Sequence, residues 1–270
     1  MFIIVTLYLF FIGLCFGSFA LAMVDRMKSG KDWVKGRSQC DNCERVLQPK
    51  DLVPLFSWLS TRGRCRYCKK KLSATYPLTE LFSGVAFLLS YLYWPFTLSD
   101  FVSIAMFVLW LCAIIVMVAL FLFDIRWFLL PNKLVRPLIG LGILWMTLDI
   151  INQGLSASIV INYVLAVLVG AGVFLLLFVM SKGKWIGDGD IRLGVAIGLF
   201  AGSPLEAWFC IFLASVIGVL ASIPLVLKTK KNKRLKLKIP FGPVLIIALY
   251  LTVLFGSQII DWYRINILYL

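Results

Sequence analysis

The chain has 270 residues, of which 61% are apolar, and its mean hydropathy is +0.95, whereas about half of a typical water-soluble domain is apolar. Its net charge of +14 would suggest a nucleic-acid partner in a soluble protein, but in so apolar a chain we attribute it to basic loops beside anionic lipid headgroups and expect no nucleic acid. The chain contains no histidine, which excludes Ser-His-Asp and Cys-His triads, HExxH zinc hydrolases and any histidine general base.

Long runs without a charged residue predict helices that cross a membrane. As a helix, each of five runs is long enough to span a hydrocarbon core of about 30 Å. Three further runs fit less well, because 81–98 follows Glu80 closely, 134–148 contains Arg136 and 191–202 is short. The sequence therefore predicts an all-α polytopic membrane protein with about eight transmembrane helices. The five clear runs are 2–24, 101–123, 154–180, 207–227 and 239–260.

The positions of the basic residues predict which side of the membrane each loop faces. No basic residue precedes the first apolar run and Arg26 follows it, so we expect no cleaved signal peptide and an outside amino terminus. Eight crossings would return the carboxyl terminus to the outside. Of the 27 Lys and Arg residues, 26 then fall in loops predicted to be cytoplasmic, and only Arg264 falls outside. These loops are 24–77, 124–136, 182–192 and 228–238.

The polar segment 25–77 contains two C-x-x-C pairs with 21 residues between them. Two such pairs can complete a tetrahedral site of four thiolates, which suits Zn²⁺, and a loop this short would gain folding energy from a structural metal. The alternative is two disulfides or a redox pair, but disulfides rarely persist in the cytoplasm. We therefore predict a first transmembrane helix at 1–24, a cytoplasmic zinc-binding domain at 25–77 and a membrane domain of about seven helices at 78–270. The predicted ligands are Cys40, Cys43, Cys65 and Cys68.

Four acidic residues remain once those of the polar loop and of the predicted outer helix ends are set aside: Glu80, Asp124, Asp188 and Asp190. Asp124 ends an apolar helix shortly before Pro131, which stops the helix from continuing. Asp190 opens the sixth predicted helix. Since the third and sixth helices run in opposite directions, both aspartates are expected at the cytoplasmic boundary.

Two carboxyl groups at one membrane boundary could share a proton and so provide an acid and a base around a single water. Gly187 and Gly189 have no side chains, so a substrate backbone or another helix could approach Asp190 closely. The alternative is that Asp124 and Asp190 are ordinary interfacial caps, because helix N-termini favour aspartate.

Five motifs follow one another along the chain, from about Gly17 to Pro243. They are CFGSFALAMVDR at 15–26, the cysteine loop with RSQCDNC at 37–43 and DLVPLFSWLSTRGRCRYCKKKLSATYPLTEL at 51–81, Asp124 followed by Leu130-Pro131-Asn132, Gly187-Asp188-Gly189-Asp190, and IPFGP at 239–243. In this order they resemble the bacterial type IV prepilin peptidases, which are membrane aspartic proteases of the GxGD class.

The resemblance implies that Asp124 and Asp190 are catalytic, with Pro131, Gly187 and Gly189 supporting the site, and that Asp188 is dispensable. It implies cleavage of the short basic leader of type IV prepilin or pseudopilin precursors, on the inner face of the bacterial cytoplasmic membrane. Many relatives also N-methylate the new amino terminus with S-adenosylmethionine, and the resemblance alone suggests this activity here. The chain departs from the family at Asn132, where Asp is common, and at Asp188, where an apolar or aromatic residue is common.

Two other functions are compatible with carboxylates beside a membrane. One is an intramembrane aspartic protease with a different substrate, of the presenilin-like kind, although the cysteine loop favours the prepilin family. The other is a transporter whose carboxylates relay protons. Transporters place such groups near the membrane midplane on broken helices, whereas these aspartates are predicted at the cytoplasmic boundary.

Overall fold

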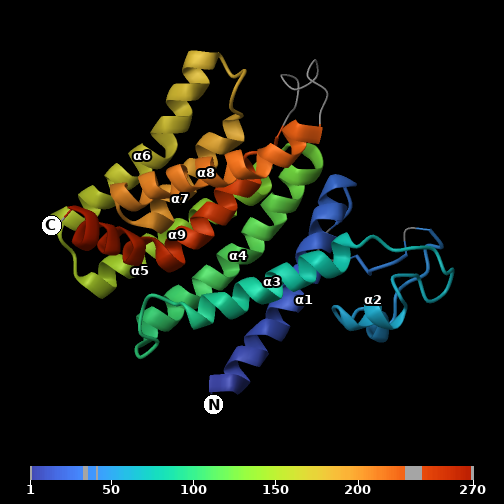
Figure 1. Ribbon diagram of the computed structural model, residues 1–270. Helices are drawn as coiled ribbons and strands as arrows, with labels where there is room; N and C mark the ends of the chain where they lie inside the picture. Colours follow the sequence, from blue (N-terminus) through green and yellow to red (C-terminus); the bar gives the residue numbers. More distant parts are fainter. Residues whose placement is uncertain (1, 33–35, 41, 229–238, 269–270) are drawn as a thin grey trace. The chain divides into compact units, whose positions relative to one another are not determined.

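The computed structural model describes residues 2–32, 36–40, 42–228 and 239–268, and the described residues form helices without any strand. The chain divides into two compact units (Figure 1). Unit 1 comprises Met1–Trp94 and Ile114–Leu122, and unit 2 comprises Pro95–Ala113 and Phe123–Leu270. The long helix α4 (Phe101–Trp127) contributes residues to both units.

Unit 1 is built on the close packing of α1 (Phe2–Lys28) and α3 (Thr75–Leu92), which lie side by side in Figure 1. A Cβ added at Gly13 would lie 2.7 Å from the carbonyl oxygen of Ser83, and one added at Gly17 would lie 2.7 Å from the Ser83 hydroxyl. Small residues let the two helix backbones approach this closely, as is common between membrane helices. The chain between them carries the cysteine pairs, a 3₁₀ turn η1 (Pro49–Asp51) and the short helix α2 (Phe56–Ser60).

Unit 2 surrounds the short helix α7 (Asp188–Ala201) with longer helices, which Figure 1 shows around it. Backbone meets backbone between α6 and α7, since a Cβ added at Gly194 would lie 2.3 Å from the carbonyl oxygen of Gly170. The end of α7 also joins an aromatic cluster, in which Phe200 meets Trp110 and Trp145 edge-on or tilted. The other helices of unit 2 are α5 (Asn132–Gln153), α6 (Ala157–Ser181), α8 (Pro204–Lys228) and α9 (Gly242–Tyr263), followed by the π-helical turn η3 (Arg264–Leu268).

The all-α membrane fold is confirmed, but the count of eight crossings is not. Each of the eight predicted apolar runs has a corresponding helix, yet only six helices of the described chain are long and apolar enough to cross a membrane. The two exceptions are α3, with 18 residues, and α7, with 14. The run predicted at 81–98 ends early because the residue before Pro95 is disfavoured in a helix and Tyr93 already caps α3.

The sidedness of the loops stays a prediction, and most of the basic loop 228–238 lies outside the described residues. In a cysteine-free background, Lys133→Cys is expected to react with a membrane-impermeant thiol reagent only after the membrane has been permeabilised, so that the reagent reaches the cytoplasmic side. Leu155→Cys, at the predicted outer end of α6 and 82% exposed, is the matched control and should react from outside. Labelling of position 133 in intact cells would overturn the predicted topology.

Candidate active site

Asp124 occupies the last turn of α4, at a point where the chain is forced to leave the helix. Phe128 adopts the left-handed conformation with φ 54°, and its N–H donates back to the carbonyl oxygen of Asp124 at 2.9 Å. Pro131 then serves as the N-cap of α5. Asp124 is only 6% exposed, so its carboxylate is held inside unit 2 rather than in solvent.

One oxygen of Asp124 is fixed by a backbone group that lies 118 residues further along the chain. The N–H of Gly242 donates to Oδ2 of Asp124 at 2.9 Å, and Gly242 is the first residue of α9. The first N–H groups of a helix lack partners within that helix and carry partial positive charge, so a carboxylate is a favourable acceptor there. This hydrogen bond fixes the position of Oδ2.

Asp190 is the third residue of α7 and is half-buried in the same unit. Its Oδ2 accepts the N–H of Gly187 at 3.2 Å, so the side chain folds back over the start of its own helix. Burial raises the pKa of Asp190 to about 6, the N–H of Gly187 acts against this, and the nearby charge of Asp124 raises it further. Both aspartates lie in unit 2.

Asp188 differs from Asp190 in its surroundings, although only one residue separates them. We expected Asp188 to precede the helix, but α7 begins at Asp188 and Gly187 is its N-cap. Helix N-termini favour an acidic residue in the first turn, and Arg192 one turn later forms an ion pair with Asp188. The side chain of Asp188 is 59% exposed, so it is turned toward solvent.

The side chain of Leu130 lies beside Gly189, next to Asp190, and beside Gly242, which donates to Asp124. The sequence pattern did not single out Leu130 beyond its place in the Leu-Pro-Asn motif. A Cβ added at Gly189 would lie 2.8 Å from Cβ of Leu130. One added at Gly242 would lie 2.6 Å from Oδ2 of Asp124 and 3.2 Å from Cδ2 of Leu130. Both glycines are thus needed for the starts of α7 and α9 to approach this segment.

The four predicted cysteine ligands come together in unit 1, with all four sulfur atoms within 4.8 Å of one another. Each pair sits in a small hairpin of the same design. The N–H of Cys40 donates to the carbonyl oxygen of Arg45 at 3.0 Å, and the N–H of Cys65 donates to that of Lys70 at 2.8 Å. Glu44 and Lys69 take equivalent left-handed positions, with φ 52° and 59°.

The spacing of the sulfurs fits a tetrahedral metal. Sulfur atoms about 2.3 Å from a central Zn²⁺ lie about 3.8 Å apart by tetrahedral geometry, and Sγ of Cys40 is 3.8 Å from Sγ of Cys68. The amide of Asn42 lies 3.7 Å from Sγ of Cys68, and its oxygen accepts from Nζ of Lys70 at 2.8 Å, which links the two hairpins. The donor set is thus suited to a structural metal.

Two carboxylates secure the cysteine hairpins and the turn before α2. Asp51 accepts from Nε of Arg66 at 2.7 Å and from the Tyr67 hydroxyl at 2.8 Å, and both of these residues stand between Cys65 and Cys68. Glu80, whose role the sequence left open, is 6% exposed. Its Oε2 accepts the N–H of Leu55 at 2.8 Å, which ties α3 to the start of α2.

Comparison with known proteins assigns two parts of the chain to domain families. Residues 11–94 match the Bacterial Peptidase A24 N-terminal domain, and residues 111–223, which include Asp124 and Asp190, match the Type IV leader peptidase family. No solved structure matches the chain.

Several proteins of known name are similar over most of the chain. The Prepilin leader peptidase/N-methyltransferase of Aeromonas hydrophila is 32% identical over 238 residues, which cover 86% of this chain and 76% of the relative. The protein of the same name from Bacillus subtilis (strain 168) is 29% identical over 259 residues, or 94% of this chain and 96% of the relative. On this evidence, the chain is a multi-pass membrane protein that belongs to the type IV leader peptidase family.

Proposed function

We propose that this chain is a prepilin leader peptidase, which removes the short basic leader of type IV prepilin or pseudopilin precursors at the inner face of the bacterial cytoplasmic membrane. The observation that supports the proposal is that Leu130 lies beside both aspartate segments: a Cβ at Gly189, next to Asp190, would be 2.8 Å from Cβ of Leu130, and one at Gly242, which donates to Asp124, would be 3.2 Å from Cδ2 of Leu130. Both aspartates lie within the region that matches the leader peptidase family.

Lipids surround the spanning helices, whose exposed side chains include Leu168 and Val219.

The mechanism follows from two neighbouring carboxyl groups that hold one proton between them. Like charges at short range disfavour double ionisation, so the pair titrates as a unit. The ionised carboxylate takes a proton from a water molecule as that water attacks the scissile carbonyl. The protonated carboxyl donates a hydrogen bond to the carbonyl oxygen, where negative charge develops. The hydrogen bond from Gly242 holds the Asp124 carboxylate still through this step.

The four-cysteine cluster is proposed to bind Zn²⁺ in a structural role. Cys40, Cys43, Cys65 and Cys68 would supply four thiolates, which leave no open coordination position for a substrate or water. The metal would supply folding energy to a segment with little apolar core.

A second activity is proposed from the names of the relatives, which join the peptidase to an N-methyltransferase. The substrate would be the amino terminus that leader cleavage exposes, and the methyl donor would be S-adenosylmethionine. No glycine-rich nucleotide loop marks the sequence, so this activity rests on the resemblance and on the names of the relatives.

Incubation of the detergent-solubilised protein with a purified prepilin distinguishes a peptidase from a transporter. The expected result, read by intact mass, is release of the short basic leader from the precursor. A transporter needs two compartments and would leave the precursor intact in detergent. An intact precursor, with the protein shown to be folded, would contradict the proposal.

Gly242→Ala is expected to lower kcat for leader cleavage by about 10²-fold, because small displacements of a catalytic group have effects of that size. The new methyl group would lie 2.6 Å from Oδ2 of Asp124, so the carboxylate must move. Gly140→Ala is the matched control, since nothing lies within 4 Å of a Cβ at that position. Equal kcat for the two variants would show that Gly242 does not position Asp124.

A further inference from the structure

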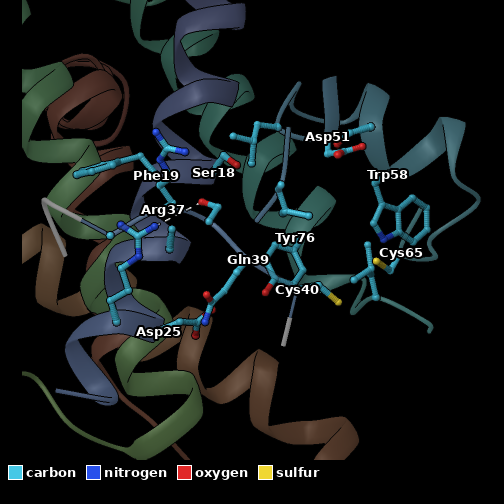
Figure 2. Close-up of a pocket in the computed structure, with 18 of the residues that line it drawn as sticks. Ser18, Phe19, Asp25, Arg37, Gln39, Cys40, Asp51, Trp58, Cys65 and Tyr76 are labelled. Atoms are coloured by element: carbon cyan, nitrogen blue, oxygen red, sulfur yellow. Dashed lines mark hydrogen bonds between the residues drawn. The ribbon is translucent and has the colours of Figure 1, made fainter. Parts of the chain in front are cut away.

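Polar side chains also gather away from the two proposed catalytic aspartates. One such place is a pocket in unit 1, which Figure 2 shows lined by Asp25, Trp58 and Tyr76, and none of the residues proposed for leader cleavage lines it. Another lies in unit 2, at the end of α7 opposite to Asp190. Because this second group bears on the helix that carries Asp190, it can influence the reaction from a distance.

Tyr163, on α6, stands against the end of α7. A Cβ added at Gly202, the left-handed C-cap of α7 with φ +73°, would lie 3.3 Å from the hydroxyl oxygen of Tyr163 and 3.4 Å from its Cζ. Tyr163 is only 3% exposed, so the phenol has little room to move. Gly202 lies about 18 Å from Asp190 along the helix, at a rise of 1.5 Å per residue. The phenol therefore forms a stop at the end of α7.

Asp149, on α5, holds the phenol in this position. The Tyr163 hydroxyl donates to Oδ2 of Asp149 at 2.7 Å, and Nε2 of Gln153 donates to the same oxygen at 2.7 Å. We set Asp149 aside with the acidic residues at predicted outer helix ends, yet it is only 7% exposed. An ionisable residue inside a membrane helix costs free energy and is a functional candidate by default. Here its hydrogen bond with Tyr163 joins α5 to α6 at the end of α7.

The contacts along the side of α7 do little to fix its position along its own axis. It packs on α6 through glycine, since a Cβ at Gly194 would lie 2.3 Å from the carbonyl oxygen of Gly170. Such contacts bring backbones close together but lack the side chains that interlock as ridges and grooves. The aromatic cluster around Phe200 adds packing without a hydrogen bond of defined direction. The hydrogen-bonded pair of Tyr163 and Asp149 supplies that direction.

We infer that Tyr163, held by Asp149, is a positioning residue that sets the place of the Asp190 carboxyl relative to Asp124. The inference rests on the peptidase function proposed above. A close-packed interior transmits a displacement rather than absorbing it, so a movement at one end of the 14-residue α7 moves the other end. A shift of about 1 Å at a catalytic group can slow a reaction about 10²-fold.

Cleavage of a purified prepilin by Tyr163 variants tests the inference. Tyr163→Leu removes the ring and the hydroxyl, and should lower kcat about 10²-fold. KM should not change, because the effect is on the placement of Asp190 and not on binding of the precursor. Tyr163→Phe keeps the ring against Gly202 but loses the hydrogen bond, and should lower kcat about fivefold. Tyr263→Phe, at an exposed position on α9, is the matched control and should keep the wild-type kcat.

Two variants of Asp149 separate the hydrogen bond from the charge. Asp149→Leu has a similar size but accepts no hydrogen bond, and should lose at least as much kcat as Tyr163→Phe. Asp149→Asn keeps an oxygen that can accept from the Tyr163 hydroxyl, and should restore most of the activity that Asp149→Leu loses. Equal losses in the two Asp149 variants would contradict the inference, because the hydrogen bond would then not be what matters.

The same change in an Asp190→Asn background distinguishes positioning from a general loss of structure. If Tyr163 acts through Asp190, Tyr163→Leu should not lower the residual single-turnover rate of Asp190→Asn any further. A merely structural role would lower the rate by the same factor in both backgrounds and would refute the inference.

The outcomes also separate this inference from the proposed function. A wild-type kcat in Tyr163→Leu would overturn the positioning role and leave the peptidase function intact. If the wild type does not cleave the prepilin, the proposed peptidase function is wrong and the positioning role falls with it.

Discussion

Asp124→Asn and Asp190→Asn are each expected to reduce the single-turnover rate of leader cleavage by about 10²- to 10⁴-fold, the usual contribution of a general acid or base. Asparagine has nearly the size of aspartate but cannot take up or release a proton. In the proposed mechanism one carboxyl group activates the water and the other polarises the scissile carbonyl, so the loss of either should disable the pair.

The structure indicates that both variants will still fold. Asparagine at 124 keeps an oxygen that can accept the Gly242 N–H, and asparagine at 190 can still accept from Gly187. Far-UV circular dichroism and membrane levels should therefore match the wild type. Cleavage at the wild-type rate by either variant would show that the replaced aspartate takes no part in the mechanism.

Loss of the metal is the second large effect that we expect. Cys40→Ser should lower the zinc content from about one per chain to near zero, since Cys40 is a buried member of a four-sulfur site with no spare ligand. Structural zinc sites supply about 10 kcal/mol or more of apparent binding energy. Segment 25–77 should therefore unfold and become sensitive to protease, while the membrane helices stay folded.

Elemental analysis and limited proteolysis measure these two consequences. Cys15→Ser is the matched control, because Cys15 is exposed on α1 and belongs to no metal group among the described residues. A protein that is free of metal but keeps a protease-resistant cysteine loop would refute the structural role of zinc.

The sequence predicted the helices well because long uncharged runs leave few alternatives to membrane-spanning helices. The count of eight crossings is not confirmed, since six helices of the described residues are long and apolar enough to cross a membrane, and apolar composition alone does not show where a helix ends. The run 191–202 forms α7, which is short and packs through Gly170, Gly194 and Gly198 against α6. Glycine contacts of this kind depend on which helix lies opposite, and the pattern of one helix does not contain that information.

The cysteine cluster and the aspartate pair were predictable to different degrees. Two C-x-x-C pairs define their own geometry, since each hairpin is local in sequence. The pairing of Asp124 with Asp190 required an assumed topology, and their catalytic roles remain a proposal. The hydrogen bond between Gly242 and Asp124 could not be predicted, because it joins residues 118 positions apart. Its donor is a backbone N–H, which nearly every residue has, so the residue type does not reveal it.

The central claim is that Asp190, and not Asp188, is the partner of Asp124. It is tested most directly by prepilin cleavage with Asp188→Asn and Asp190→Asn at matched membrane levels, with the released leader quantified by mass spectrometry. Asp188 is exposed and paired with Arg192, so its replacement should keep most of the activity. Asp190 is half-buried, and the charge of Asp124 contributes to its raised pKa, so its replacement should slow cleavage by about 10²- to 10⁴-fold. An inactive Asp188→Asn together with an active Asp190→Asn would contradict the assignment.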